Sequence, residues 1–85
     1  MENNKLLKKK IIYRSKHRGT KEMDLLLGDF VYKFIDTFSE KELTELSNLL
    51  NTEDETIYNW YFNRSSKVKF PVNRVTEKLK KFKIY

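Results

Sequence analysis

The chain has 85 residues, which is the size of one small domain, and it carries a net charge of +6. It has no cysteine, so disulfides and thiolate metal sites are excluded. No apolar run approaches the roughly 20 residues that span a membrane, and the N-terminus lacks the apolar core of a secretion signal. We therefore expect no membrane insertion and no secretion.

The charges fall into three blocks along the chain. Residues 1–21 carry a balance of +7, residues 22–63 a balance of −8, and residues 64–85 again +7. Basic arms of this kind can fold against the chain's own acidic middle, so the net charge is weak support for nucleic-acid binding. A small basic nucleic-acid-binding protein and a toxin–antitoxin partner remain alternatives at this point.

Two amphipathic helices are predicted in the N-terminal half. Residues 5–16 place Leu7 and Ile11 on one side and leave a run of lysines on a solvated face. Residues 20–38 give the clearest pattern, with apolar side chains at three- and four-residue steps and Gly28 inside the helix. The predicted apolar stripe consists of Met23, Leu26, Leu27, Phe30, Val31, Phe34, Ile35 and Phe38.

Three further helices follow. Ser39 and Glu42 form a capping box that opens a helix to about residue 50, and a second capping box is predicted at residues 52–55. Residues 63–71 read as a loop because Pro71 disfavours helical geometry before it, and residues 72–82 form a last helix. We expect residues 1–4 and 84–85 to fray. Residues 1–85 are thus predicted to form a single all-α domain, a small five-helix bundle.

The bend between the first two helices, around residues 17–24, combines several helix-end signals. Gly19 can adopt a positive φ and end the first helix, Thr20 can cap the second, and Glu22 falls in its first turn. An ordinary helix–helix connector has the same features. These residues alone leave a connector and a functional corner equally open.

The sequence offers little for catalysis. His17 is the only histidine, and the two glycines are too far apart for a phosphate-binding loop. Glu22 and Asp24 are two residues apart on a helix, so they do not share a face. We therefore predict a binding protein that is not an enzyme, with no catalytic, metal-binding or cofactor-binding residues.

Two sequence blocks resemble a known family. Residues 18–22 read RGTKE and match the RGxxE motif of the succinate dehydrogenase flavinylation (assembly) factors, the bacterial SdhE family with a mitochondrial counterpart. Residues 49–60, with Leu49-Leu50, Asp54 and Tyr58-Asn59-Trp60, look like a second segment of that family. The chain departs from the family pattern at Lys16 and in its lysine-rich C-terminal part.

The resemblance implies a function. Such a protein would bind the flavoprotein subunit of succinate dehydrogenase, and that of fumarate reductase as a further partner, and promote covalent attachment of FAD. It would hold no cofactor stably itself, and it would bind no nucleic acid. We expect a monomer in the bacterial cytoplasm.

The resemblance also implies a site. By the motif, Arg18, Gly19 and Glu22 would contact the flavoprotein, with Asp24 beside them. The rim would be formed by His17 and Arg14. On this basis Gly19→Arg and Glu22→Ala should leave the bundle folded but remove the stimulation of flavin attachment.

Overall fold

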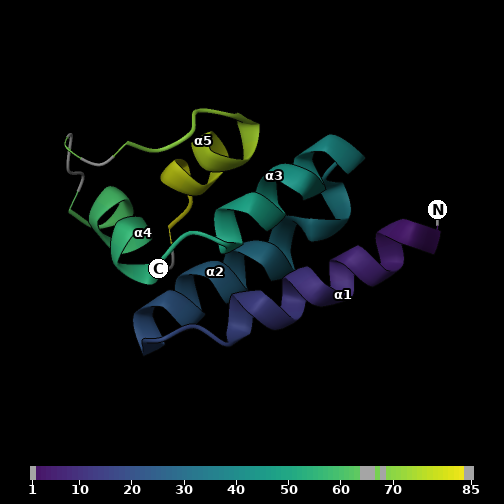
Figure 1. The fold of residues 1–85 in the computed structure, drawn as a ribbon, viewed down its shortest axis with the longest axis horizontal. Coiled ribbons are helices and arrows are strands. Elements are labelled where there is room, and N and C mark those ends of the chain that lie inside the picture. Colours follow the sequence, from purple (N-terminus) through teal and green to yellow (C-terminus); the bar gives the residue numbers. More distant parts are fainter. Residues whose placement is uncertain (1, 64–66, 68, 84–85) are drawn as a thin grey trace.

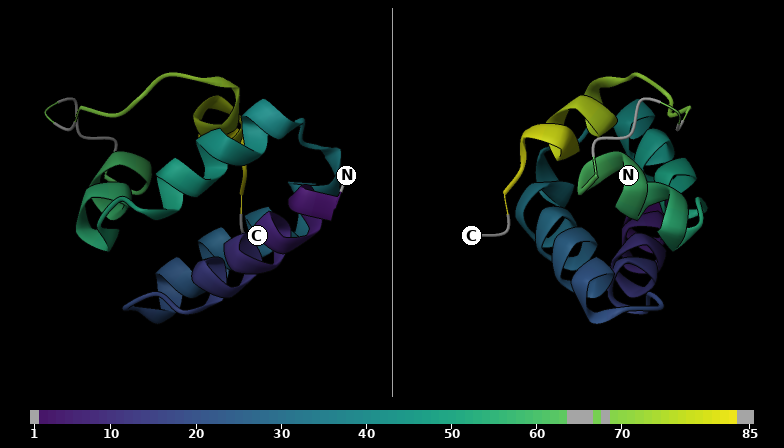
Figure 2. Two further views of the ribbon diagram at one scale, coloured as in Figure 1. Left: turned by 45° about the vertical axis from the view of Figure 1, so that its right-hand side comes forward. Right: turned by 90° about the vertical axis from the view of Figure 1, so that its left-hand side faces the viewer.

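The computed structural model describes residues 2–63, 67 and 69–83, which form five α-helices and one short 3-10 helix (Figure 1). The elements are α1 (Glu2–Lys16), α2 (Lys21–Phe34), η1 (Ile35–Thr37), α3 (Glu40–Leu50), α4 (Asp54–Tyr61) and α5 (Arg74–Lys81). Helices α1 and α2 lie antiparallel, α3 packs against α1, and α5 packs against α3 (Figure 2). The described residues contain no strand, which confirms the all-α prediction.

None of the helices within the described ranges combines the length and the apolar character needed to cross a bilayer.

Helix α2 supplies the centre of the core. Its predicted apolar stripe is buried except for Phe34, which is half-buried and packs against the core. The α-helix ends at Phe34, and the chain continues as η1, where the Thr37 hydroxyl donates to the Phe34 carbonyl at 2.7 Å. The predicted helix over 20–38 is therefore correct in type and shorter in extent.

The other helices each add apolar side chains to this core. Helix α3 buries four leucines at the predicted positions, and α1 contributes Ile11. Rings of Phe30, Phe34 and Phe82 meet with centroids 5.3–5.9 Å apart, so the chain after α5 packs onto α2. The four leucines of α3 are Leu43, Leu46, Leu49 and Leu50, and further buried apolar residues are Ile57, Tyr61, Val75 and Leu79.

The N-termini of the helices show which of the predicted capping residues are correct. Thr20 caps α2 by accepting from the Met23 N–H at 3.3 Å, and the Ser39–Glu42 capping box is present with bonds of 2.8 and 3.2 Å. The capping box predicted at residues 52–55 is wrong, because Glu53 is the N-cap of α4 and makes no side-chain cap bond. Thr52 belongs to the end of α3 instead, where its N–H donates to the Leu49 carbonyl at 3.0 Å.

The two end helices differ from their predicted bounds. Helix α5 begins at Arg74 because Asn73 and Thr76 form a reciprocal capping box, so Val72 precedes the helix and is 82% exposed. Helix α1 begins at Glu2 and not at residue 5. Of the predicted loop and frayed ends, residues 1, 64–66, 68 and 84–85 lie outside the described residues.

Gly28 lies where α2 faces the end of α1, and the structure leaves room there for a methyl group. A Cβ at this position would be 3.6 Å from Lys16 Cγ and 3.8 Å from the Ser15 carbonyl, which are ordinary contacts. Because glycine costs about 1 kcal/mol relative to alanine inside a helix, we expect Gly28→Ala to stabilise the bundle by about 0.5–1 kcal/mol. Urea unfolding measures this, and a loss of stability would contradict the helix packing described.

Candidate functional site

The bend between α1 and α2 holds an ion pair that links the two sequence blocks. Arg18 donates its Nε–H to Asp54 Oδ1 at 2.7 Å, and its Nη2 lies 2.6 Å from the same oxygen. The Arg18 side chain is only 9% exposed and that of Asp54 is 25% exposed. The RGTKE bend is thereby fixed to the first turn of α4.

The same guanidinium also closes the end of α3. Arg18 Nη1 donates to the Leu50 carbonyl at 2.7 Å, and Nη2 donates to the Thr52 carbonyl at 2.8 Å. Carbonyls at a helix C-terminus lack partners within the helix and carry the negative end of its dipole, so a cation is favoured there. Arg18 thus holds the connection between α3 and α4 in place.

Backbone groups of the bend complete this arrangement. The Gly19 N–H donates to Asp54 Oδ2 at 2.6 Å, and the Arg18 N–H donates to Asp24 Oδ1 at 2.6 Å. We call the set Arg18, Gly19, Asp24 and Asp54 the Arg18 clasp. Every one of these hydrogen bonds has a charged partner, and such bonds are stronger than those between neutral groups.

Glycine is favoured at position 19 for a different reason from the one predicted. Its backbone is outside the left-handed region, so the expected positive φ is wrong. A Cβ at Gly19 would lie 3.0 Å from Asp54 Oδ2, closer than most real contacts of a Cβ. Glycine is therefore favoured here because the carboxylate of Asp54 comes so close to the backbone.

Other predicted site residues lie on the outside of the bend. Glu22 is exposed and has no hydrogen bond or ion pair within the described residues. His17 donates its Nδ1–H to the Tyr13 carbonyl at 2.7 Å and stacks on the Tyr13 ring, with centroids 3.9 Å apart. Arg14 is exposed and donates to Asn51 Oδ1 at 2.5 Å.

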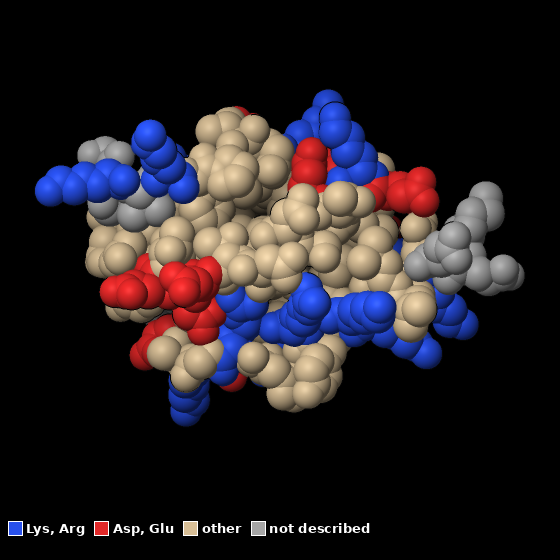
Figure 3. All heavy atoms as spheres, in the orientation of Figure 1, with Lys and Arg blue, Asp and Glu red and all other residues tan. Residues whose placement is uncertain are grey.

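The surface charge is uneven around this site. In Figure 3 acidic side chains gather at the end of the molecule formed by the bend and α4, whereas Lys and Arg side chains line the face along α1. The motif itself contributes an exposed carboxylate, Glu22, and beside it an exposed cation, Lys21.

The structure thus divides the six predicted site residues into two groups. Glu22, Gly19, His17 and Arg14 are exposed, whereas the Arg18 guanidinium and the Asp24 carboxylate turn toward the protein itself. Contact of Arg18 and Asp24 with a partner stays a prediction. Sequence reasoning missed Asp54 as the partner of Arg18, although its place in the second block was a usable signal.

Within the clasp, Arg18 and Asp54 bind each other, two carbonyls at and just beyond the end of α3 and the Gly19 N–H, so the clasp holds the bend to α3 and α4. Among the residues that the structure describes, no three His, Cys, Asp or Glu side chains are grouped so as to hold a metal ion.

A comparison with protein families gives one match, which covers residues 9–83 and is described as the flavinator of succinate dehydrogenase. The chain belongs to this family. The matched range contains the whole Arg18 clasp as well as α5.

Individual relatives agree with this assignment. The chain is 39% identical over 57 residues to "FAD assembly factor SdhE" of Acetobacter pasteurianus, which covers 67% of this chain and 52% of the relative. It is 40% identical over 74 residues to "Succinate dehydrogenase assembly factor 2, mitochondrial" of Dictyostelium discoideum, covering 87% of this chain and 50% of the relative. The chain thus spans about half the length of these two relatives. No solved structure matches the chain.

The clasp predicts that substitutions of two aspartates affect the stability of the bundle very differently. Asp54→Ala removes the charge partner of a nearly buried guanidinium and the acceptor of the Gly19 N–H. We therefore expect the free energy of unfolding to fall by about 2–3 kcal/mol. Asp36→Ala is the matched control. It breaks the 3.2 Å pair with Lys8, in which the Asp36 side chain is 86% exposed.

For Asp36→Ala we expect the free energy of unfolding to change by no more than about 0.5 kcal/mol, as is usual for exposed ion pairs. Thermal and urea unfolding of both variants make the comparison, and equal losses would show that the clasp does not hold the bundle together.

Proposed function

We propose that this protein is an assembly factor of succinate dehydrogenase, which binds the flavoprotein subunit and promotes covalent attachment of FAD to it. The single observation that carries the proposal is the family match over residues 9–83. The names of the relatives from Acetobacter pasteurianus and Dictyostelium discoideum support it. Neither the family nor these relatives support the nucleic-acid-binding and toxin–antitoxin alternatives.

The proposed docking surface is the outer side of the bend. Glu22 supplies an unpaired carboxylate, Gly19 leaves the backbone bare, and His17 and Arg14 flank them. The Arg18 clasp behind this surface fixes its shape before the partner arrives, which lowers the conformational cost of binding. Arg18 and Asp24 then act on the partner chiefly by holding Gly19 and Glu22 in position.

The proposed mechanism needs no catalytic group on this chain. Attachment of the flavin requires the isoalloxazine ring and the accepting side chain of the flavoprotein to be held in alignment, and alignment alone lowers a barrier substantially. A small rigid protein that binds one arrangement of a mobile flavoprotein more tightly raises the population of that arrangement. In this proposal the FAD stays with the flavoprotein.

Three finer points belong to the same proposal. The protein acts as a monomer and works in the bacterial cytoplasm. It also binds the flavoprotein subunit of fumarate reductase as a further partner. The relative from Acetobacter pasteurianus, a bacterial protein, supports the bacterial setting.

Glu22→Ala tests the docking surface without disturbing the bundle. Glu22 is exposed and unpaired among the described residues, so we expect unchanged helicity and melting temperature but at least a ten-fold loss of flavin attachment. In-gel flavin fluorescence of the flavoprotein, after incubation with FAD and each variant, gives the readout. Glu40→Ala is the control, since Glu40 is likewise an exposed glutamate in the first turn of a helix. Normal attachment with Glu22→Ala would remove Glu22 from the site.

The structure changes the expected outcome for Gly19→Arg. Any Cβ at this position crowds Asp54 Oδ2, so the substitution should disturb the clasp as well as cover the docking surface. We expect a lower melting temperature together with loss of flavin attachment. Unchanged thermal stability would show that the Asp54 carboxylate can move away without cost.

A further inference from the structure

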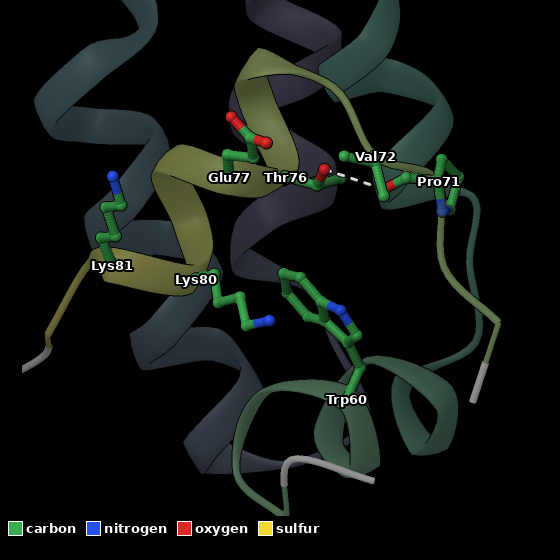
Figure 4. A pocket seen from close by; sticks show the side chains of 7 residues that line it. All are labelled: Trp60, Pro71, Val72, Thr76, Glu77, Lys80 and Lys81. Carbon is green, nitrogen blue, oxygen red and sulfur yellow. Dashed lines mark hydrogen bonds between the residues drawn. The ribbon is translucent and has the colours of Figure 1, made fainter. Parts of the chain in front are cut away.

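A second surface lies between the C-terminal end of α4 and α5. These elements and the chain before α5 enclose a pocket of about 320 Å³ (Figure 4). One wall is the indole of Trp60, which stacks on the Phe70 ring with centroids 4.3 Å apart and planes 13° apart. Pro71 and Val72 form the rim, and Lys80 lies opposite. The pocket is therefore an aromatic surface with a cation beside it.

The polar groups at the indole are hydrogen-bond donors. In Figure 4 the Lys80 ammonium points toward the indole of Trp60, and it has no ion pair or hydrogen bond within the described part of the chain. The Trp60 N–H is likewise not hydrogen-bonded there, and the Thr76 hydroxyl is already used because it donates to the Pro71 carbonyl at 2.8 Å. An occupant would thus be favoured if it brought acceptors.

The remaining charged groups of the pocket do not change the preference for an occupant with hydrogen-bond acceptors. Glu77 and Lys81 line it as well, but they are four residues apart on α5 and both point away from the indole in Figure 4. Opposite charges at this spacing offset each other. Lys80 therefore sets the charge next to Trp60, which is positive.

The apolar part of the surface extends beyond the pocket. Val72 at the rim is 82% exposed, and Pro71 beside it is exposed as well. A pocket of about 320 Å³ is at the lower limit of ligand sites in proteins, which suits one or two side chains. A polypeptide segment would fill it and also cover the rim.

We propose that this pocket binds an acidic segment of the flavoprotein, with an apolar side chain against Trp60 and a neighbouring carboxylate on Lys80. This inference rests on the proposed function. Helix α4 connects the two surfaces, because Asp54 at its start belongs to the clasp and Trp60 follows six residues later, about 9 Å along the axis. A partner that covers the bend can therefore reach the pocket, and two linked contacts bind more tightly than either one alone.

The first test compares a lysine of the pocket, Lys80, with a lysine outside it, Lys33. The purified flavoprotein subunit of succinate dehydrogenase is immobilised, and the Kd is measured for the full chain and for each variant. Lys80→Gln should weaken binding about five- to ten-fold, because a desolvated charge-assisted contact is lost. Lys33→Gln removes the same charge from an exposed lysine on α2 that does not line the pocket, and it should change the Kd less than about two-fold. Circular dichroism verifies that both variants are folded.

The second test changes the sign of charge at the rim. Val72→Lys should tighten binding and Val72→Asp should weaken it, since the proposed segment is acidic. The same pair of substitutions at Tyr32 on α2, which is also 82% exposed, should leave the Kd unchanged. Opposite effects at residue 72 alone cannot arise from a general loss of stability.

The outcomes separate this inference from the proposed function. If the wild-type chain binds the flavoprotein and Lys80→Gln binds equally well, the pocket inference is overturned while the proposed function stands. If the wild-type chain does not bind the flavoprotein, the proposed function fails first. Self-association of the wild type in sedimentation, abolished by Val72→Asp, would assign the pocket to a second copy and also overturn the inference.

Discussion

One ion pair, between Arg18 and Asp54, joins the bend after α1 to the connection between α3 and α4. Helix α4 has only eight residues, and its N-cap makes no side-chain hydrogen bond. A helix this short is unstable by itself, so contacts from elsewhere must hold its first turn. Arg18 meets the Asp54 carboxylate there while it binds two carbonyls at the end of α3. The desolvation of both ions is offset because each has several partners.

This constraint divides the RGTKE segment into an inner and an outer part. Arg18 and the Gly19 N–H face Asp54, whereas Glu22 faces outward from the first turn of α2. A short motif can therefore combine residues that shape a surface with a residue that presents a charge on it. Substitutions at Arg18 would change both stability and docking, so they report on neither separately. Glu22 is the position where docking can be studied alone.

The sequence allowed prediction of those features that depend on neighbours along the chain. The stripe of α2 and the Ser39–Glu42 capping box follow from periodicity and from spacings of three or four residues. The orientation of Arg18 could not be predicted in this way, because its partner Asp54 lies 36 residues away. The start of α4 was misjudged for a different, local reason. Thr52 looks like a cap, but its N–H is bound to the Leu49 carbonyl at the end of α3. The charge blocks did carry information, since the Lys8–Asp36 and Arg18–Asp54 pairs both join the first block to the middle one.

The third block of charge behaves differently from the first. The cations of α5 form no ion pair within the described residues, and Lys78 lies 4.5 Å from the centre of the Phe34 ring instead. Helix α4 therefore has acidic groups near its start, at the bend, and the positive charge of Lys80 near its end, at Trp60. Opposite charges at the two ends of one helix favour a single orientation on a partner of complementary charge, because the reversed orientation would bring like charges together. Orientation matters for the proposed function, since a protein that acts by aligning its partner must bind it in one way only.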